Sequence, residues 1–141
     1  MSYFTRQSTN QGLHDRAVKD IARKRFDGLK YDVYTNPNGE KNASVGVESN
    51  PLYADIIVLE KGYGRRTAIT IGEIETADTI NENEAEQWAE YTATKIPFYL
   101  YVPAGCAQAT VNVLNKKSIK ISGLRTYKYL SSGEIVITNI F

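Results

Sequence analysis

Three carboxylates lie in segments that are otherwise typical of buried β-strands. Glu73 and Glu75 are one residue apart in "IGEIET", residues 71–76, and Asp55 lies within "YADIIVLE", residues 53–60. Alternate side chains of a strand point to the same face, so Glu73 and Glu75 share one face of their strand. Carboxylates that gather on one face are the oxygen ligands that a hard divalent cation prefers.

The two segments are joined by "KGYGR", residues 61–65, whose two glycines favour a β-hairpin. A hairpin centred near Tyr63 places Asp55 opposite Ile71 and makes Glu73 its diagonal neighbour on the same side. The carboxylates then cluster at one end of a surface made of Ile and Leu. A register slip of one residue would separate them.

Like charges beside apolar side chains are costly to desolvate, so these carboxylates stay ionised only where the sheet end is hydrated or a cation lies among them. Mg²⁺ suits such a site, because it takes one or two carboxylates and retains water molecules for a substrate phosphate. The alternative is that the hairpin end opens to solvent and the acids are ordinary surface residues.

Charge is distributed unevenly along the chain. Its 141 residues include 17 Lys and Arg and 16 Asp and Glu, yet residues 67–94 contain seven acids and no Lys or Arg. The rest of the chain therefore contains all 17 Lys and Arg residues but only nine acids. A basic body around an acidic segment suits an enzyme that acts on a polyanion with a divalent cation. Charge alone favours the alternative, a solvated acidic helix on an ordinary surface.

The elements that must position these groups follow from apolar periodicity and turn-forming residues. Residues 36–51 are rich in turn-formers and predict a long loop. Asn81 or Thr79 is available as the N-cap of the second helix, each with a glutamate three residues later. The predicted helices are 13–27, 80–94 and 104–117, and the predicted strands are 31–35, 53–60, 66–76, 97–102 and a final hairpin over 124–130 and 134–141.

This order predicts an α/β fold in which helices pack on a mixed β-sheet. The unit of strand, helix and strand across residues 66–102 requires a parallel pair joined by a right-handed crossover. The length predicts one domain, residues 13–141, preceded by a polar arm, residues 1–12. The absence of a long apolar segment and the single cysteine, Cys106, predict a soluble cytoplasmic protein without an intrachain disulfide.

The pattern of acids and elements resembles the PD-(D/E)XK nuclease superfamily. Its core is an α-β-β-β-α-β arrangement with an Asp on one central strand and Glu-x-Lys on the next. Here "ADIIV" supplies Asp55 and "EIE" supplies Glu73 and Glu75. "QWAEY" adds Gln87 and Tyr91, which are similar to the Gln-x-x-x-Tyr motif of the RecB-type branch.

The chain departs from the superfamily pattern at two positions. Ala54 stands where Pro often precedes the Asp, and Glu75 stands where Lys is usual. Some restriction endonucleases of the superfamily also carry Glu at the second position. Without Lys, this position supplies no positive charge to the transition state.

The resemblance implies a metal-dependent phosphodiester hydrolase, an endonuclease acting on nucleic acid and preferentially on DNA. Asp55 and Glu73 would hold Mg²⁺, or Mn²⁺, with the backbone carbonyl of Ile74. The metal would polarise the phosphoryl oxygen, lower the pKa of its bound water and neutralise the leaving oxygen. Glu75 would bind a second metal or orient the attacking water.

Gln87 and Tyr91 are four residues apart and share a helix face, from which an amide and a phenol can reach a bound water or a phosphate. Taken alone, the pair is also compatible with an ordinary amphipathic helix. His14, the only histidine, lies on the first predicted helix, which often borders the site in this superfamily. A lone histidine is more often a surface or capping residue.

Basic side chains on the first helix and in the hairpin turn are the candidates for phosphate contacts. Long basic side chains also cover the surfaces of proteins that never meet DNA. These candidates are Arg16, Lys19, Arg23, Arg65 and Arg66.

Two other functions compete with the nuclease hypothesis. A catalytically inactive nuclease-fold module that binds nucleic acid or a protein partner would explain the missing lysine. An unrelated α/β interaction domain would carry Asp55 and Glu73 on opposite faces. For an active enzyme with one site per chain, cleavage of both strands of a duplex favours a homodimer.

Overall fold

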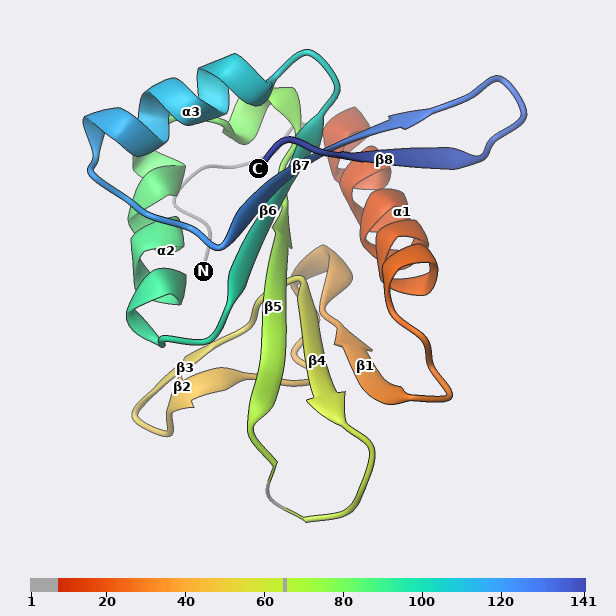
Figure 1. Ribbon diagram of the computed structural model, residues 1–141, viewed down its shortest axis with the longest axis vertical. Coiled ribbons are helices and arrows are strands. Elements are labelled where there is room, and N and C mark those ends of the chain that lie inside the picture. Colours follow the sequence, from red (N-terminus) through yellow and green to blue (C-terminus); the bar gives the residue numbers. More distant parts are fainter. Residues whose placement is uncertain (1–7, 65) are drawn as a thin grey trace.

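A computed structural model describes residues 8–64 and 66–141 of the chain. A six-stranded mixed sheet lies between helices, with one helix on one face and two on the other (Figure 1). The predicted α/β class with a mixed sheet is confirmed. The helices are α1 (Ser8–Arg25), α2 (Glu82–Ala93) and α3 (Ala107–Lys116), and the short 3₁₀ turns are η1 (Pro37–Gly39) and η2 (Ala77–Thr79). The strands are β1 (Tyr31–Thr35), β2 (Val45–Val47), β3 (Asn50–Leu52), β4 (Ile56–Glu60), β5 (Ala68–Ile74), β6 (Phe98–Pro103), β7 (Gly123–Tyr129) and β8 (Ile135–Asn139).

The strand order across the sheet is β1-β4-β5-β6-β7-β8. Strands β1, β4 and β5 are antiparallel neighbours, and β5 pairs with β6 in parallel, as the β5-α2-β6 unit requires. Strand β7 extends the parallel part beside β6, and β8 returns antiparallel to it. Figure 1 shows the β7–β8 hairpin reaching beyond the rest of the sheet on the side of α1.

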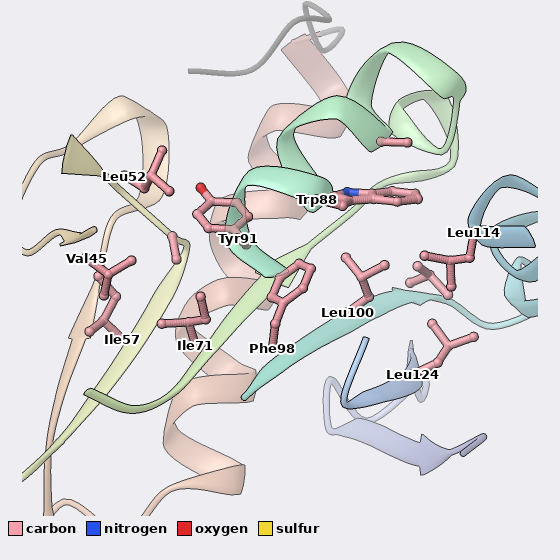
Figure 2. Close-up of a cluster of buried hydrophobic side chains, with 13 residues drawn as sticks. Val45, Leu52, Ile57, Ile71, Trp88, Tyr91, Phe98, Leu100, Leu114 and Leu124 are labelled. Atoms are coloured by element: carbon pink, nitrogen blue, oxygen red, sulfur yellow. The ribbon is translucent and has the colours of Figure 1, made fainter. Parts of the chain in front are cut away.

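Apolar side chains fill the space on both faces of the sheet. One cluster joins Ile57, Ile71 and Leu100 of the sheet to Trp88 and Tyr91 of α2, and Figure 2 shows these two aromatic side chains extending from α2 over the sheet. A second cluster lies beneath α1 on the opposite face, and its helical members are the buried residues Ala17, Val18, Ile21 and Ala22. These four residues form the apolar face of the helix that the sequence predicts over residues 13–27.

The helix boundaries differ from the predicted ones by a few residues, because polar positions at helix ends carry little periodic signal. Helix α1 begins at Ser8, ahead of the predicted residue 13, and ends at Arg25. Asn81 is the N-cap of α2, where its side-chain oxygen accepts a hydrogen bond of 2.9 Å from the Glu84 amide. None of the helices in the described part of the chain combines the length and apolar character that a membrane span requires.

The prediction of one long loop over residues 36–51 is wrong. The segment contains η1 and the antiparallel β2–β3 pair, which are too short to show a periodic pattern. Asn36, which is only 4% exposed, connects this segment to the residues that precede β4. Its amide nitrogen donates to the backbone oxygens of Ala54 (2.7 Å) and Ala43 (2.9 Å), and its side-chain oxygen accepts from the Asn42 amide (2.7 Å).

The register of the β4–β5 hairpin differs from the predicted one by two residues. Ile57 pairs with Ile71 and Ile56 pairs with Gly72, so the ladder leads to Glu73 opposite Asp55. A bulge between Val58 and Leu59 shifts the register in the part of the hairpin that is nearer the turn. Sequence periodicity does not reveal such a bulge. A displacement of two residues preserves the alternation of faces, so Asp55 and Glu73 remain neighbours.

Candidate metal centre

The acidic residues meet at the end of the sheet where β5 ends, β4 begins and α2 starts. Glu73 is the penultimate residue of β5 and Glu75 follows the strand directly. Asp55 immediately precedes β4, and Glu84 lies in the first turn of α2. The hairpin and the following helix thus bring together four carboxylates from a segment that runs from residue 55 to residue 84.

Glu73 lies at the centre of the group. Its side chain is 5% exposed, and its Oε1 accepts a hydrogen bond of 2.8 Å from the backbone amide of Asp55. Burial raises the pKa of the Glu73 carboxyl well above its usual value, and repulsion from Asp55 and Glu75 raises it further. The position therefore disfavours a negative charge unless a cation compensates it.

Glu75 and Glu84 complete a compact set of oxygen donors around Glu73. The side chains of Glu75 and Glu84 are 0% and 1% exposed, and one oxygen from each of the three glutamates lies within 4.8 Å of the others. Trp88 donates from Nε1 to Glu75 Oε1 at 3.3 Å. Among the described residues, this cluster has the composition and spacing of a site for a hard divalent cation.

Asp55 lies beside this cluster with one oxygen engaged by the protein. Its Oδ2 accepts a hydrogen bond of 2.8 Å from the Ile74 amide and lies 3.0 Å from Nε2 of His14. The backbone oxygen of Asp55 accepts from the Asn36 amide at 3.0 Å. The Asp55 side chain is thereby fixed between the end of β5 and helix α1.

Gln87 and Tyr91 face the carboxylates from α2. Gln87 is 6% exposed and Tyr91 is 1% exposed, and Gln87 Nε2 donates to the Tyr91 hydroxyl at 3.4 Å. Burial raises the pKa of the Tyr91 phenol, and the nearby Glu73 and Asp55 raise it further. Tyr91 is therefore a protonated hydrogen-bond donor next to these two acids.

The predicted basic residues do not converge on the acids. Arg66 lies at the opposite end of β5, roughly 20 Å along the strand from Glu73, where it pairs with Asp32. This pairing lowers the pKa of Asp32 and raises that of Arg66. Arg65 lies outside the described residues.

The candidates on α1 line the outer surface of that helix. Lys19 is exposed. Arg23 pairs with Asp20 at 2.7 Å, and the Arg16 guanidinium lies 3.9 Å from the centre of the Tyr129 ring. Both arginine side chains nevertheless remain more than half exposed, at 79% and 54%. These cations lie on the surface of α1 and are not part of the acidic centre.

Two residues of the site had weak signals in the sequence. Glu84 is one of several acids in an acidic helix, and its only distinguishing sign is its spacing of three residues from Gln87, which places both on one helix face. His14 approaches Asp55 across 41 positions of sequence, a contact that no local pattern encodes. His14 is 3% exposed, so it is not one of the surface histidines that a lone histidine more often is.

Comparison with protein-family models, with curated proteins and with solved structures gives no match to this chain. Function is therefore inferred from the site itself. Buried carboxylates from a segment without Lys or Arg fit a divalent cation with oxygen ligands, since such an ion offsets both their desolvation and their mutual repulsion.

Proposed function

We propose that the protein is a metal-dependent phosphodiester hydrolase, an endonuclease that acts on nucleic acid, with DNA as the favoured substrate. The observation that carries the proposal is the burial of Glu73 between Asp55 and the other two glutamates. The Gln87–Tyr91 pair on the adjacent helix adds polar groups at the same place. The resemblance to PD-(D/E)XK nucleases in element order and motif supports the same function.

Asp55 and Glu73 hold Mg²⁺ or Mn²⁺ in this proposal, with the backbone carbonyl of Ile74 as a further ligand. When bound, the cation supplies Lewis-acid activation of the phosphoryl oxygen and of the attacking water, and it stabilises the leaving oxygen. Glu84 extends the set of available oxygen ligands toward α2.

The remaining polar groups act on water and phosphate. Glu75 accepts hydrogen bonds only and orients the attacking water or receives its proton. The Tyr91 phenol and the Gln87 amide donate hydrogen bonds to phosphate oxygens. Because Glu75 stands where Lys is usual in the superfamily, positive charge for the transition state must come from the bound cation or from elsewhere in the chain.

The proposal extends to the partner and the assembly. Arg16, Lys19 and Arg23 contact phosphates along α1 and supply affinity without sequence readout. A symmetric homodimer places two sites on opposite strands of a duplex. A cytoplasmic location is proposed from the single cysteine, which suits a reducing compartment.

The proposal is tested by incubating the protein with plasmid, single-stranded and branched DNA in the presence of Mg²⁺ or Mn²⁺. We expect cleavage that chelation abolishes and that Asp55→Ala removes. The matched control is Glu48→Ala, which removes an exposed acid in the β2–β3 turn. Cleavage that is unchanged in Asp55→Ala would refute the assignment.

A second candidate function is a catalytically inactive module that binds nucleic acid or a protein partner. The observation that favours it is the fully buried Glu75 at the usual lysine position, with Trp88 as its hydrogen-bond donor. Such a module would bind DNA without cleaving it and would not bind divalent cations by calorimetry. DNA turnover that Glu73→Ala abolishes would eliminate this candidate.

A further inference from the structure

The only histidine of the chain lies between two carboxylates at the edge of the candidate metal centre. His14, in the first half of α1, is 3% exposed, and its Nε2 is 3.0 Å from Asp55 Oδ2. Its Nδ1 is 3.0 Å from Asp15 Oδ1. A carboxylate only accepts hydrogen bonds, so a ring nitrogen that bonds to one must donate.

Asp15 fixes the far side of the ring. Its Oδ1 also accepts hydrogen bonds from Gln11 Nε2 at 2.8 Å and from the backbone amide of Asn38 at 3.0 Å. Helix α1 and the η1 turn therefore hold Asp15 from two sides. A ring that is held by such an anchor has a defined orientation toward Asp55.

The contact with His14 determines which oxygen of Asp55 is available. Oδ2 has two partners, the His14 ring and the Ile74 amide. Within residues 8–64 and 66–141, Oδ1 of Asp55 forms no hydrogen bond. The carboxylate is therefore held by one oxygen and presents the other to a ligand.

We propose that His14, anchored by Asp15, is a positioning residue that holds Asp55 by Oδ2 so that Oδ1 binds the divalent cation. This inference rests on the proposed function, because it assigns a supporting role in the same metal site. It differs from direct ligation by His14, since its ring nitrogens are directed at the two carboxylates.

The first test is the Mn²⁺ affinity of the chain without a polyhistidine tag, measured by calorimetry. His14→Leu retains the side-chain bulk and removes the donor, so we expect its affinity to fall about tenfold or more. His14→Gln places an amide donor near the position of Nε2 and should remain within a few-fold of the wild type. Asp15→Ala should fall between the two. Glu48→Gln, which changes an exposed acid in the β2–β3 turn, is the control and should bind as the wild type does.

The second test does not depend on a metal. Because the chain has one histidine, its ring N–H groups are assigned in NMR spectra without ambiguity. We expect an Nε2–H that is protected from exchange with water in the wild type and loses this protection in Asp55→Ala. Rapid exchange of this proton in the wild type would overturn the proposal.

The outcomes separate the positioning role from the proposed function. If the wild type binds Mn²⁺ and His14→Leu binds it equally well, the positioning role is wrong and the metal site stands. If His14→Gln loses as much affinity as His14→Leu, the imidazole itself is required, and positioning through Asp55 is wrong. If the wild type binds no Mn²⁺, both the metal site and the role of His14 in it are wrong.

Discussion

Glu73 combines deep burial with two neighbouring carboxylates, so a negative charge there destabilises the fold while it equips the site for a cation. Such conflicts between local stability and function are typical of active sites. Glu73→Gln removes the charge and keeps an oxygen that can accept from the Asp55 amide. In the metal-free protein at neutral pH, we expect the free energy of unfolding of this variant to exceed that of the wild type by about 1 kcal/mol or more. This difference is equivalent to a melting temperature that is higher by about 3 °C.

The size of this stability difference depends on pH. The pKa of Glu73 is raised in the folded state, so the stabilisation from its proton is present at low pH and is lost as the pH rises through the folded-state pKa. The advantage of Glu73→Gln should therefore grow toward neutral pH and disappear below about pH 4. Thermal melts of both proteins across this range test it, with exposed Glu48→Gln as the control. A difference in melting temperature between the two proteins that stays constant at all pH values would contradict the raised pKa of Glu73.

Trp88 provides a local reporter of cation binding, because it is the only tryptophan and donates to Glu75. Paramagnetic Mn²⁺ bound among the glutamates should quench its fluorescence in a saturable manner. In Glu73→Gln, the apparent affinity should fall at least about tenfold, since even substitutions outside the ligand set commonly cost that much. Quenching that is weak and linear in the wild type would argue against a site beside Trp88.

Helix α1 is connected to the β7–β8 hairpin by two polar contacts in its second half. The Tyr129 hydroxyl donates to Asp20 Oδ2 at 2.7 Å, and Lys24 Nζ donates to the Ile135 backbone oxygen at 2.7 Å. These bonds help to hold the helix that carries His14 against the sheet. The position of His14 therefore depends on the C-terminal hairpin, although the two are far apart in sequence.

Tyr129→Phe removes one of these bonds with little change in packing. We expect the free energy of unfolding at neutral pH to fall by about 1 kcal/mol. Burial and the bond to Asp20 raise the pKa of Tyr129, so its stabilising contribution is lost as the pH rises above about 10, where the unfolded chain ionises. Urea denaturation at neutral and alkaline pH measures this, and Tyr63→Phe at a fully exposed position is the control. An equal loss in both variants would contradict the role of the Asp20 contact.

The elements that position the site were predictable from sequence because they carry strong periodic signals. The apolar stripe of α1, the alternation in β5 and the N-cap at Asn81 each specify local structure within a few residues. The parallel pairing of β5 with β6 followed from the helix between them. The β2–β3 pair was not predictable, because three-residue strands beside turn-formers show no alternation.

The composition of the site was predictable only in part. Alternation along a strand indicated that Glu73 shares a side with Asp55. This prediction holds despite the bulge, because the register differs from the predicted one by an even number of residues. The contact of His14 with Asp55 depends on how α1 packs across the sheet. The contribution of Glu84 depends on where α2 begins relative to β5. Tertiary packing of this kind leaves no periodic trace in a single sequence.

Across the whole molecule, the acidic centre and the basic surface of α1 are separate. DNA affinity should therefore depend on salt through the basic residues, independently of the bound cation. Lys19→Ala removes one exposed charge on α1, and we expect the slope of log K against log salt to become shallower by about one if Lys19 contacts a phosphate. The charge-matched control is Lys61→Ala, whose lysine pairs with Asp32 at the far end of the β4–β5 hairpin. Equal slopes in the wild type and Lys19→Ala would exclude this contact.

The most direct measurement is the rate of DNA cleavage by Glu73→Gln with Mg²⁺ or Mn²⁺, compared with the wild type and with Glu48→Gln. Glu73→Gln is expected to be at least as stable as the wild type, so lost activity would not result from unfolding. The predicted result is cleavage by the wild type and by Glu48→Gln, with a rate for Glu73→Gln that is lower by at least about a hundredfold. Cleavage by Glu73→Gln at the wild-type rate, or no cleavage by the wild type with either cation, would contradict the assignment of a metal-dependent nuclease.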